Sequence, residues 1–409
     1  MTSTTPEPVG VSSAVPRRFA AGNALRAIAA LFVLVFHAGI ATLLWKLGQS
    51  SVTGEGTPSQ FKPIFGALAP EFVNMRAGIY IFFALSGYLL TRPFLAAYLL
   101  GTPHPSIPRY FRNRALRIIP AFWVVTTLYV LWARGDNGGG IAGLLAVYGY
   151  AQNYYPTAAG EIMSQAWTLD IEVAFYIMIP VASILALTAG RRMQTTPLKR
   201  LAIVLTVLLA SYVLSLLFKH QAGNPIKLTY NLADYLFAFI PGVALAAVEP
   251  FAAPRLRGSR SGRILAWGLL GLCIGLLGVF ISLPVSDYGL RLIFVTVGCG
   301  ALLGAPLVLQ WTTSSCWRVL DNRVMNWLGE RSYGIYLIHL GLMTHVLARF
   351  GHSHGVKSTF LLLLSGVTLV TLLGADLLWR FVERPALHRR LPWRQAEFKR
   401  PAATAAAES

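Results

Sequence analysis

Apolar runs of about 20 residues recur along the whole chain, and each is long enough to cross a lipid bilayer as a helix. We predict ten such spans, near residues 23–45, 77–100, 115–133, 165–189, 201–218, 229–248, 264–283, 290–311, 327–348 and 359–382. The segment 141–155 is too short to cross and rich in tyrosine, so we expect it at one membrane interface. The predicted fold is therefore an all-α integral membrane protein, a bundle of ten transmembrane helices.

The composition excludes other classes of protein. Hydrophobic residues make up 55% of the chain and charged residues 12%, about half the share usual in soluble domains. A cytosolic enzyme is excluded, and so is a disordered chain, because disorder requires low hydrophobicity. The 3 cysteines have no metal-ligand spacing, so neither a disulfide framework nor a metal site is expected.

The basic residues predict which side of the membrane each loop faces. With the N-terminus inside, 23 of the 35 Lys and Arg residues fall in cytoplasmic segments and 9 in outer segments, which supports two cytoplasmic termini. The net charge of +19 is attributed to contact with anionic inner-leaflet lipids, and no nucleic-acid partner is expected. We expect a cytoplasmic tail over 1–22, a transmembrane domain over 23–385 and a basic cytoplasmic tail over 386–409, with 46–76 as an outer loop.

Two ionisable residues lie within the first span, where a charge is costly and therefore marks a candidate site. Arg26 and His37 are eleven residues apart, about 1100° of rotation and ~16 Å of rise on an α-helix. They therefore share one face and can line one cavity, with the cation at its cytoplasmic mouth. Taken singly, Arg26 is better explained by a side chain that reaches the interface, and His37 by packing.

The fourth span carries two carboxylates, Asp170 near its outer end and Glu172 about two turns into the helix. A carboxylate in a span needs a partner, and a histidine or arginine across the bundle is the least costly one. A structural ion pair competes with a functional role, more strongly for Asp170 than for Glu172.

Four arginines, Arg109, Arg112, Arg114 and Arg117, stand at the entry to the third span. Arg114 and Arg117 are three residues apart on one face, and guanidinium groups suit bidentate contacts with phosphate. Anchoring at the anionic leaflet accounts for Arg109 and Arg112.

The other ionisable residues are interpreted as mainly structural. His339 lies mid-span, where packing and chemistry are equally good explanations, and Glu383 is expected to pair with an arginine. Asp234 and Asp376 are expected to pair with polar neighbours within the bundle. The remaining histidines of this region give a weak hint of metal binding: His345, His352 and His354.

Six motifs together resemble the membrane-bound acyltransferase-3 family, over about residues 23–385. They are LRAIAALFVLVFHA, FFALSGYLL at 82–90, RNRALRIIP with Arg-x-x-Arg at 114 and 117, WTLDIEVAFY at 167–176, SYGIYLIHL at 332–340 and FVERP at 381–385. Many relatives carry two adjacent carboxylates where this chain has Glu172 followed by Val173, so the resemblance assigns no role to Asp170.

The resemblance implies an integral membrane acyltransferase that moves an acyl group, expected to be acetyl, from acyl-CoA to a hydroxyl of a cell-envelope sugar, glycolipid or similar acceptor. It implies that His37 is the catalytic histidine, that Glu172 occupies the acidic position, and that Arg26, Arg114 and Arg117 contact acyl-CoA. Imidazole ionises near neutral pH and suits the base that an alcohol acceptor needs. His37 as general base, with Glu172 orienting its ring, and His37 as a covalent acyl carrier both remain open.

Other functions remain open from the sequence alone. A transporter or flippase of a lipid-linked glycan would favour inverted repeats or paired broken helices, and neither is visible. A structural protein in which polar residues join helices is a further alternative, and the acceptor could be a secondary metabolite such as a macrolide. Arg outnumbers Lys by 28 to 7, typical of a GC-rich bacterial genome, so the expected location is the bacterial cytoplasmic (inner) membrane. The chain ends too soon for the hydrolase-like domain that some relatives carry, and its oligomeric state is not specified.

Overall fold

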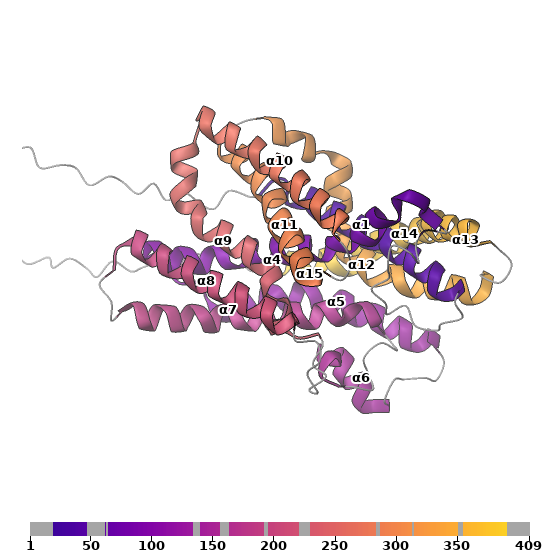
Figure 1. Cartoon of the computed structure of the whole chain (residues 1–409). Helices are drawn as coiled ribbons and strands as arrows, with labels where there is room; N and C mark the ends of the chain where they lie inside the picture. The colour runs from indigo at the N-terminus through magenta and orange to yellow at the C-terminus, as the bar shows by residue number, and fades with distance from the viewer. Residues whose placement is uncertain are drawn as a thin grey trace, which may run out of the picture.

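The computed structural model describes residues 19–46, 62, 64–133, 140–155, 163–191, 195–220, 230–283, 287–312, 315–350 and 355–390. This part of the chain is helical and contains no strand, which confirms the all-α prediction (Figure 1). Nine helical segments within it are long and apolar enough to cross a membrane, so the chain is a multi-pass membrane protein. The ninth predicted span forms the long helix α12 (Arg323–Phe350), which is too polar to be among those nine, and the count of ten stays a prediction.

Eight long helices match the first eight predicted spans. They are α1 (Gly22–Lys46), α4 (Gly78–Leu100), α5 (Ile107–Ala133), α7 (Trp167–Arg191), α8 (Pro197–His220), α9 (Leu232–Leu256), α10 (Arg260–Ser282) and α11 (Tyr288–Trp311). The last span is a continuous helical run made of α13 (Val356–Leu362), the π-helix η7 (Leu363–Val367), α14 (Thr368–Leu378), the π-helix η8 (Trp379–Glu383) and α15 (Arg384–His388).

Two predicted boundaries differ from those of the structure. Helix α5 begins at Ile107 and not near residue 115. Its first turns are charged, so hydropathy does not detect them, but they are helical. The end of the predicted outer loop, from residue 66, forms α3 (Ala69–Asn74) between the 3₁₀ turns Gly66–Leu68 and Met75–Ala77. Residues 141–155 contain only the short helix α6 (Gly140–Tyr148) and the 3₁₀ turn Gln152–Tyr154, as expected of a segment that does not cross.

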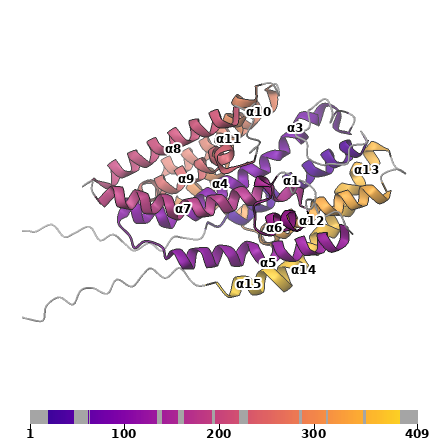
Figure 2. The same ribbon diagram turned by 90° about the horizontal axis from the view of Figure 1, so that it is seen from below.

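The helices pack around two main apolar cores. The larger core joins α4, α7, α9 and α11, with Phe83, Phe175 and Phe239 stacked at its centre. The smaller core joins α1, α12 and α13. Helix α1 also packs against α4, and α5 packs on η8 and α15 (Figure 2), so helices from both cores meet around one region of the bundle.

Helices α4 and α9 approach so closely that only glycine fits between them. A Cβ atom on Gly242 would lie 1.8 Å from the carbonyl oxygen of Ala84, and one on Gly87 would lie 2.3 Å from that of Phe239. Small residues of this kind let helix backbones meet within a membrane.

Replacement of Gly242 with alanine should therefore lower the melting temperature of the detergent-solubilised protein, because two backbones must separate. Overpacking of this kind costs about 1–3 kcal/mol. Gly271→Ala is the matched control, since nothing lies within 4 Å of a Cβ atom there. Equal thermal stability of the two variants, measured by fluorescence-detected size-exclusion chromatography, would show that this contact is wrong.

Helices α1 and α12 run side by side in the same direction. The Asn23 side-chain amide donates to Oδ1 of Asn326 at 2.8 Å. Farther along the same two helices, in the C-terminal direction of both, His37 contacts His339. A Cβ atom on Gly329 would lie 2.1 Å from the Asn23 carbonyl oxygen, so the two backbones almost touch near their first turns. This parallel register places two polar faces against each other in the bundle.

Candidate active site

A cavity of about 120 Å³ lies between α1, α4, α5, α7 and α12. Its polar lining comes from Arg26, Ser86, Arg114, Arg117, Thr168, Glu172, Tyr176, Ser332, Tyr333 and Tyr336. Four of the five site residues expected from the sequence therefore face one space, although they come from three separate helices. The remaining one, His37, is not part of the lining.

The three arginines of the cavity have few protein partners. Arg117 Nη1 forms an ion pair with Glu383 Oε2 at 3.2 Å, which confirms the expected pairing of Glu383 with an arginine. Arg26 Nη1 donates to Oδ1 of Asn23 at 3.2 Å. Nε of Arg114 is buried and has no hydrogen-bond partner among the described residues. The cavity therefore presents guanidinium groups with unused donors.

Glu172 lies among these arginines. Its Oε1 accepts hydrogen bonds from the Ser86 hydroxyl at 2.8 Å and from the Tyr176 hydroxyl at 2.7 Å. Within the described part of the chain, no hydrogen bond joins Glu172 to His37. The partner that orients the His37 ring is a different residue.

His37 contacts the second histidine of the bundle. Its Nδ1 lies 2.8 Å from the Val33 carbonyl oxygen and 3.3 Å from Nε2 of His339. A carbonyl only accepts, so in the neutral ring the proton sits on Nδ1, and Nε2 of His37 keeps its lone pair. His37 is half-buried, whereas His339 is 1% exposed.

Side chains from other elements bind the backbone of α12 on both sides of His339. The Tyr129 hydroxyl donates to the Ile338 carbonyl at 3.0 Å and accepts from the Gly341 N–H at 2.7 Å. The Gln165 amide donates to the Leu337 carbonyl at 2.8 Å. Nδ1 of His339 donates to the Ile335 carbonyl at 3.1 Å, so its Nε2 is the acceptor that faces His37. These contacts fix the ring of His339.

The wall of the cavity separates it from the two histidines. Tyr336 lines the cavity, and its ring centroid lies 5.9 Å from that of His339, which in turn lies 5.0 Å from that of His37. The expectation that Arg26 and His37 line one cavity is thus met only by Arg26. The rings of Tyr336 and Phe82 occupy the end of the cavity toward the histidines.

The sequence did not single out several of these residues. Ser86, Tyr176 and Tyr336 carry no charged group that marks them in a span, whereas the sequence marks His339 only as a mid-span histidine for which packing and chemistry are equally good explanations. Its pairing with His37 depends on the register of two helices 302 residues apart, which no local pattern contains.

The other ionisable residues make structural contacts. Asp376 pairs with Arg331 and Arg380, both at 2.6 Å, and Asp234 accepts from Asn231, so both have the polar partners expected of them. Asp170 accepts from the Asn153 backbone at 2.9 Å and has no ion pair within the described ranges.

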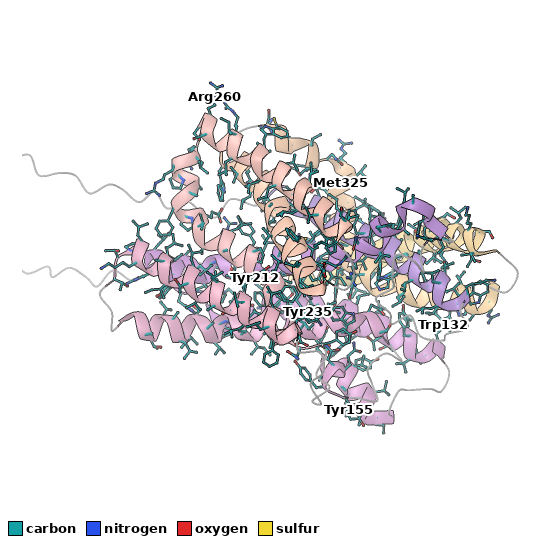
Figure 3. All side chains as sticks on the ribbon, in the orientation of Figure 1. Trp132, Tyr155, Tyr212, Tyr235, Arg260 and Met325 are labelled. Carbon is teal, nitrogen blue, oxygen red and sulfur yellow. The ribbon has the colours of Figure 1, made fainter. Side chains whose placement is uncertain are left out.

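The expected hint of a metal site finds no support in the part of the chain that is described. No group of three or more potential metal ligands occurs there. The His345 ring packs on Trp132, with ring centroids 4.4 Å apart, in a region well separated from Arg260 (Figure 3). His352 and His354 lie outside the described residues.

Comparison with known proteins identifies a family and several relatives. A family model described as an acyltransferase domain matches residues 20–380. A Bacillus subtilis protein provisionally named as a peptidoglycan O-acetyltransferase is 26% identical over 75% of this chain and 50% of its own length. A Listeria monocytogenes peptidoglycan O-acetyltransferase is 27% identical over 65% of this chain and 44% of its own length. The chain thus spans about half the length of these two relatives.

A shorter relative is covered almost completely. The exopolysaccharide production protein of Rhizobium meliloti is 26% identical over 78% of this chain and 92% of its own length. No solved structure matches the chain.

Proposed function

Because the chain belongs to the membrane-bound acyltransferase-3 family and is an acyltransferase, we propose that it moves an acetyl group from acetyl-CoA to a hydroxyl of a cell-envelope sugar or glycolipid. The observation that carries the proposal is the cavity in which three arginines meet beside the paired histidines. The proposed location is the bacterial cytoplasmic membrane.

The donor end of the site is the arginine side of the cavity. Coenzyme A carries a diphosphate and a ribose phosphate, and guanidinium groups are well suited to bind both. Arg26, Arg114 and Arg117 face the single lining carboxylate of Glu172, so the lining carries excess positive charge. The phosphates then lie among the arginines, and the pantetheine arm extends past Tyr336.

His37 is the proposed base. The acceptor hydroxyl oxygen attacks the thioester carbonyl carbon while Nε2 of His37 takes the hydroxyl proton. The carbon–sulfur bond then breaks, and the sulfur of coenzyme A leaves with that proton, which His37 returns. The products are an acyl ester and free coenzyme A. In the covalent variant, Nε2 attacks the carbonyl carbon first and passes the acyl group to the hydroxyl, whose proton goes to the thiolate.

His339 and Glu172 have distinct supporting roles in this proposal. Nε2 of His339 and the Val33 carbonyl oxygen both accept a hydrogen bond from Nδ1–H of His37. These bonds keep the lone pair on Nε2 of His37 and stabilise the imidazolium that forms. Glu172 holds the hydroxyls of Ser86 and Tyr176 and balances part of the arginine charge. The earlier expectation that Glu172 orients the His37 ring is replaced by this assignment.

The names of the relatives support a sugar acceptor. Two are named for O-acetylation of peptidoglycan and one for production of an exopolysaccharide. Sugars supply hydroxyl groups, which are the acceptors that this chemistry requires.

Release of free coenzyme A tests the proposed function. Proteoliposomes that contain the purified protein should release thiol from acetyl-CoA only when a sugar acceptor such as a peptidoglycan fragment is added. The same assay with a macrolide tests the alternative acceptor. Lack of thiol release above that of empty liposomes, combined with unchanged envelope acetylation in a deletion strain by mass spectrometry, would contradict the proposal.

A further inference from the structure

Arg390 stands beside the cavity although it belongs to the segment expected to be a basic cytoplasmic tail. It follows α15 by two residues and lies beyond residues 20–380 that the family model matches. Nε and Nη2 of its guanidinium group are buried and have no hydrogen-bond partner among the described residues. The neighbouring Arg384 and Arg389 are exposed.

The end of the last helical run directs this side chain inward. The π-helix η8 places Glu383 against Arg117, and α15 packs on α5 with Ala386 buried at the contact (Figure 2). The chain then turns, with the Arg390 N–H donating to the Leu387 carbonyl at 3.1 Å. A backbone hydrogen bond thus ties Arg390 to the end of α15.

Four guanidinium groups converge at this point. Arg390 interacts electrostatically with Arg26, Arg114 and Arg117, and burial together with these cations lowers the pKa of Arg390 to about 9. Among the described residues two carboxylates lie near this cluster: Glu383, which interacts with Arg117, Arg331 and Arg390, and Glu172, which accepts hydrogen bonds from Ser86 and Tyr176. The four guanidinium groups therefore outnumber the carboxylates around them. A buried cation beside like charges is unfavourable unless an anion joins it.

We propose that Arg390 binds a phosphate group of the acyl-CoA donor, so that the segment after α15 completes the donor site. This inference rests on the proposed function and extends it to a residue outside the matched family region. A phosphate group supplies the negative charge that the four arginines lack, and its oxygens can accept from the unused Nε and Nη2 donors. The pantetheine arm, which carries no charge, does not need Arg390.

The test compares Arg390→Gln with Arg389→Gln, an exposed neighbour of the same chemistry, on two donors. With acetyl-CoA, Arg390→Gln should raise KM roughly 10- to 100-fold with kcat unchanged, the loss typical of a charge-assisted hydrogen bond. With S-acetylpantetheine, which has no phosphate, Arg390→Gln should match the wild type. Arg389→Gln should match the wild type with both donors.

Ligand-free stability separates binding from a structural role. Since Arg390 faces like charges, Arg390→Gln should melt at the wild-type temperature or above it, yet lose most of the stabilisation that added coenzyme A gives. An equal loss of activity with both donors, a lowered melting temperature without ligand, or a wild-type KM for acetyl-CoA would each overturn the inference. A wild-type protein that uses neither thioester would instead contradict the proposed function. The stabilisation by coenzyme A, compared between the wild type and Arg390→Gln, would still test whether Arg390 binds phosphate.

Discussion

Replacement of His37 with alanine is expected to lower kcat for acetyl transfer by about 10²- to 10⁴-fold, the usual contribution of a positioned general base. The ring is half-buried, and among the described residues its hydrogen bonds reach Val33 and His339 alone, so the fold should tolerate the loss. KM for acetyl-CoA should change little, because the arginines proposed to bind the donor line the cavity and His37 does not.

The control for this variant is His345→Ala. His345 is on the same helix as His339 but packs on Trp132 outside the cavity, so its removal should leave kcat unchanged. Transfer by His37→Ala at the wild-type rate would remove His37 from the mechanism. Mass spectrometry of the wild type with acetyl-CoA and no acceptor distinguishes the two mechanisms, since only the covalent one leaves an acetyl group on His37.

Replacement of the cavity arginines is expected to raise KM for acetyl-CoA strongly, which is the second large effect. Arg117 cannot be removed alone, because Glu383 would be left as a buried unpaired carboxylate, which costs about 3–5 kcal/mol. The suitable variant combines Arg114→Ala, Arg117→Ala and Glu383→Gln. Two charge-assisted contacts are lost, each worth about 1.5–3 kcal/mol, so KM for acetyl-CoA should rise by roughly 10²-fold or more.

Arg112→Ala serves as the comparison for that variant, because Arg112 is exposed on the same helix. Steady-state kinetics should show a wild-type KM for Arg112→Ala and a raised KM for the triple variant. If the triple variant binds acetyl-CoA as the wild type does, Arg114 and Arg117 only anchor α5 at the membrane surface.

The sequence predicted the helices well because hydropathy over about 20 residues measures the property that a bilayer selects. It placed the start of α5 near residue 115 because charged residues interrupt an apolar run without interrupting a helix. It also marked Arg26, Arg114, Arg117 and Glu172 as candidate site residues, since each is an ionisable group in or near a span. In the structure all four line one cavity.

Tertiary contacts explain what the sequence did not predict. The pairing of His37 with His339 depends on how α1 and α12 lie against each other, and the α12 backbone beside His339 is bound by Tyr129 from a third helix. Arg390 looks like part of a basic tail by composition, whereas its burial follows from the packing of α15 on α5. Such contacts leave no periodic pattern in the chain.

The most direct measurement is a cryo-EM structure of the protein with a non-hydrolysable acetyl-CoA analogue. We expect the phosphate groups within hydrogen-bond distance of Arg114 and its neighbouring arginines, with the acetyl end beside Nε2 of His37. Density for the analogue elsewhere, or an acetyl end that remains distant from His37 while the phosphates occupy the arginine cavity, would contradict the proposed mechanism.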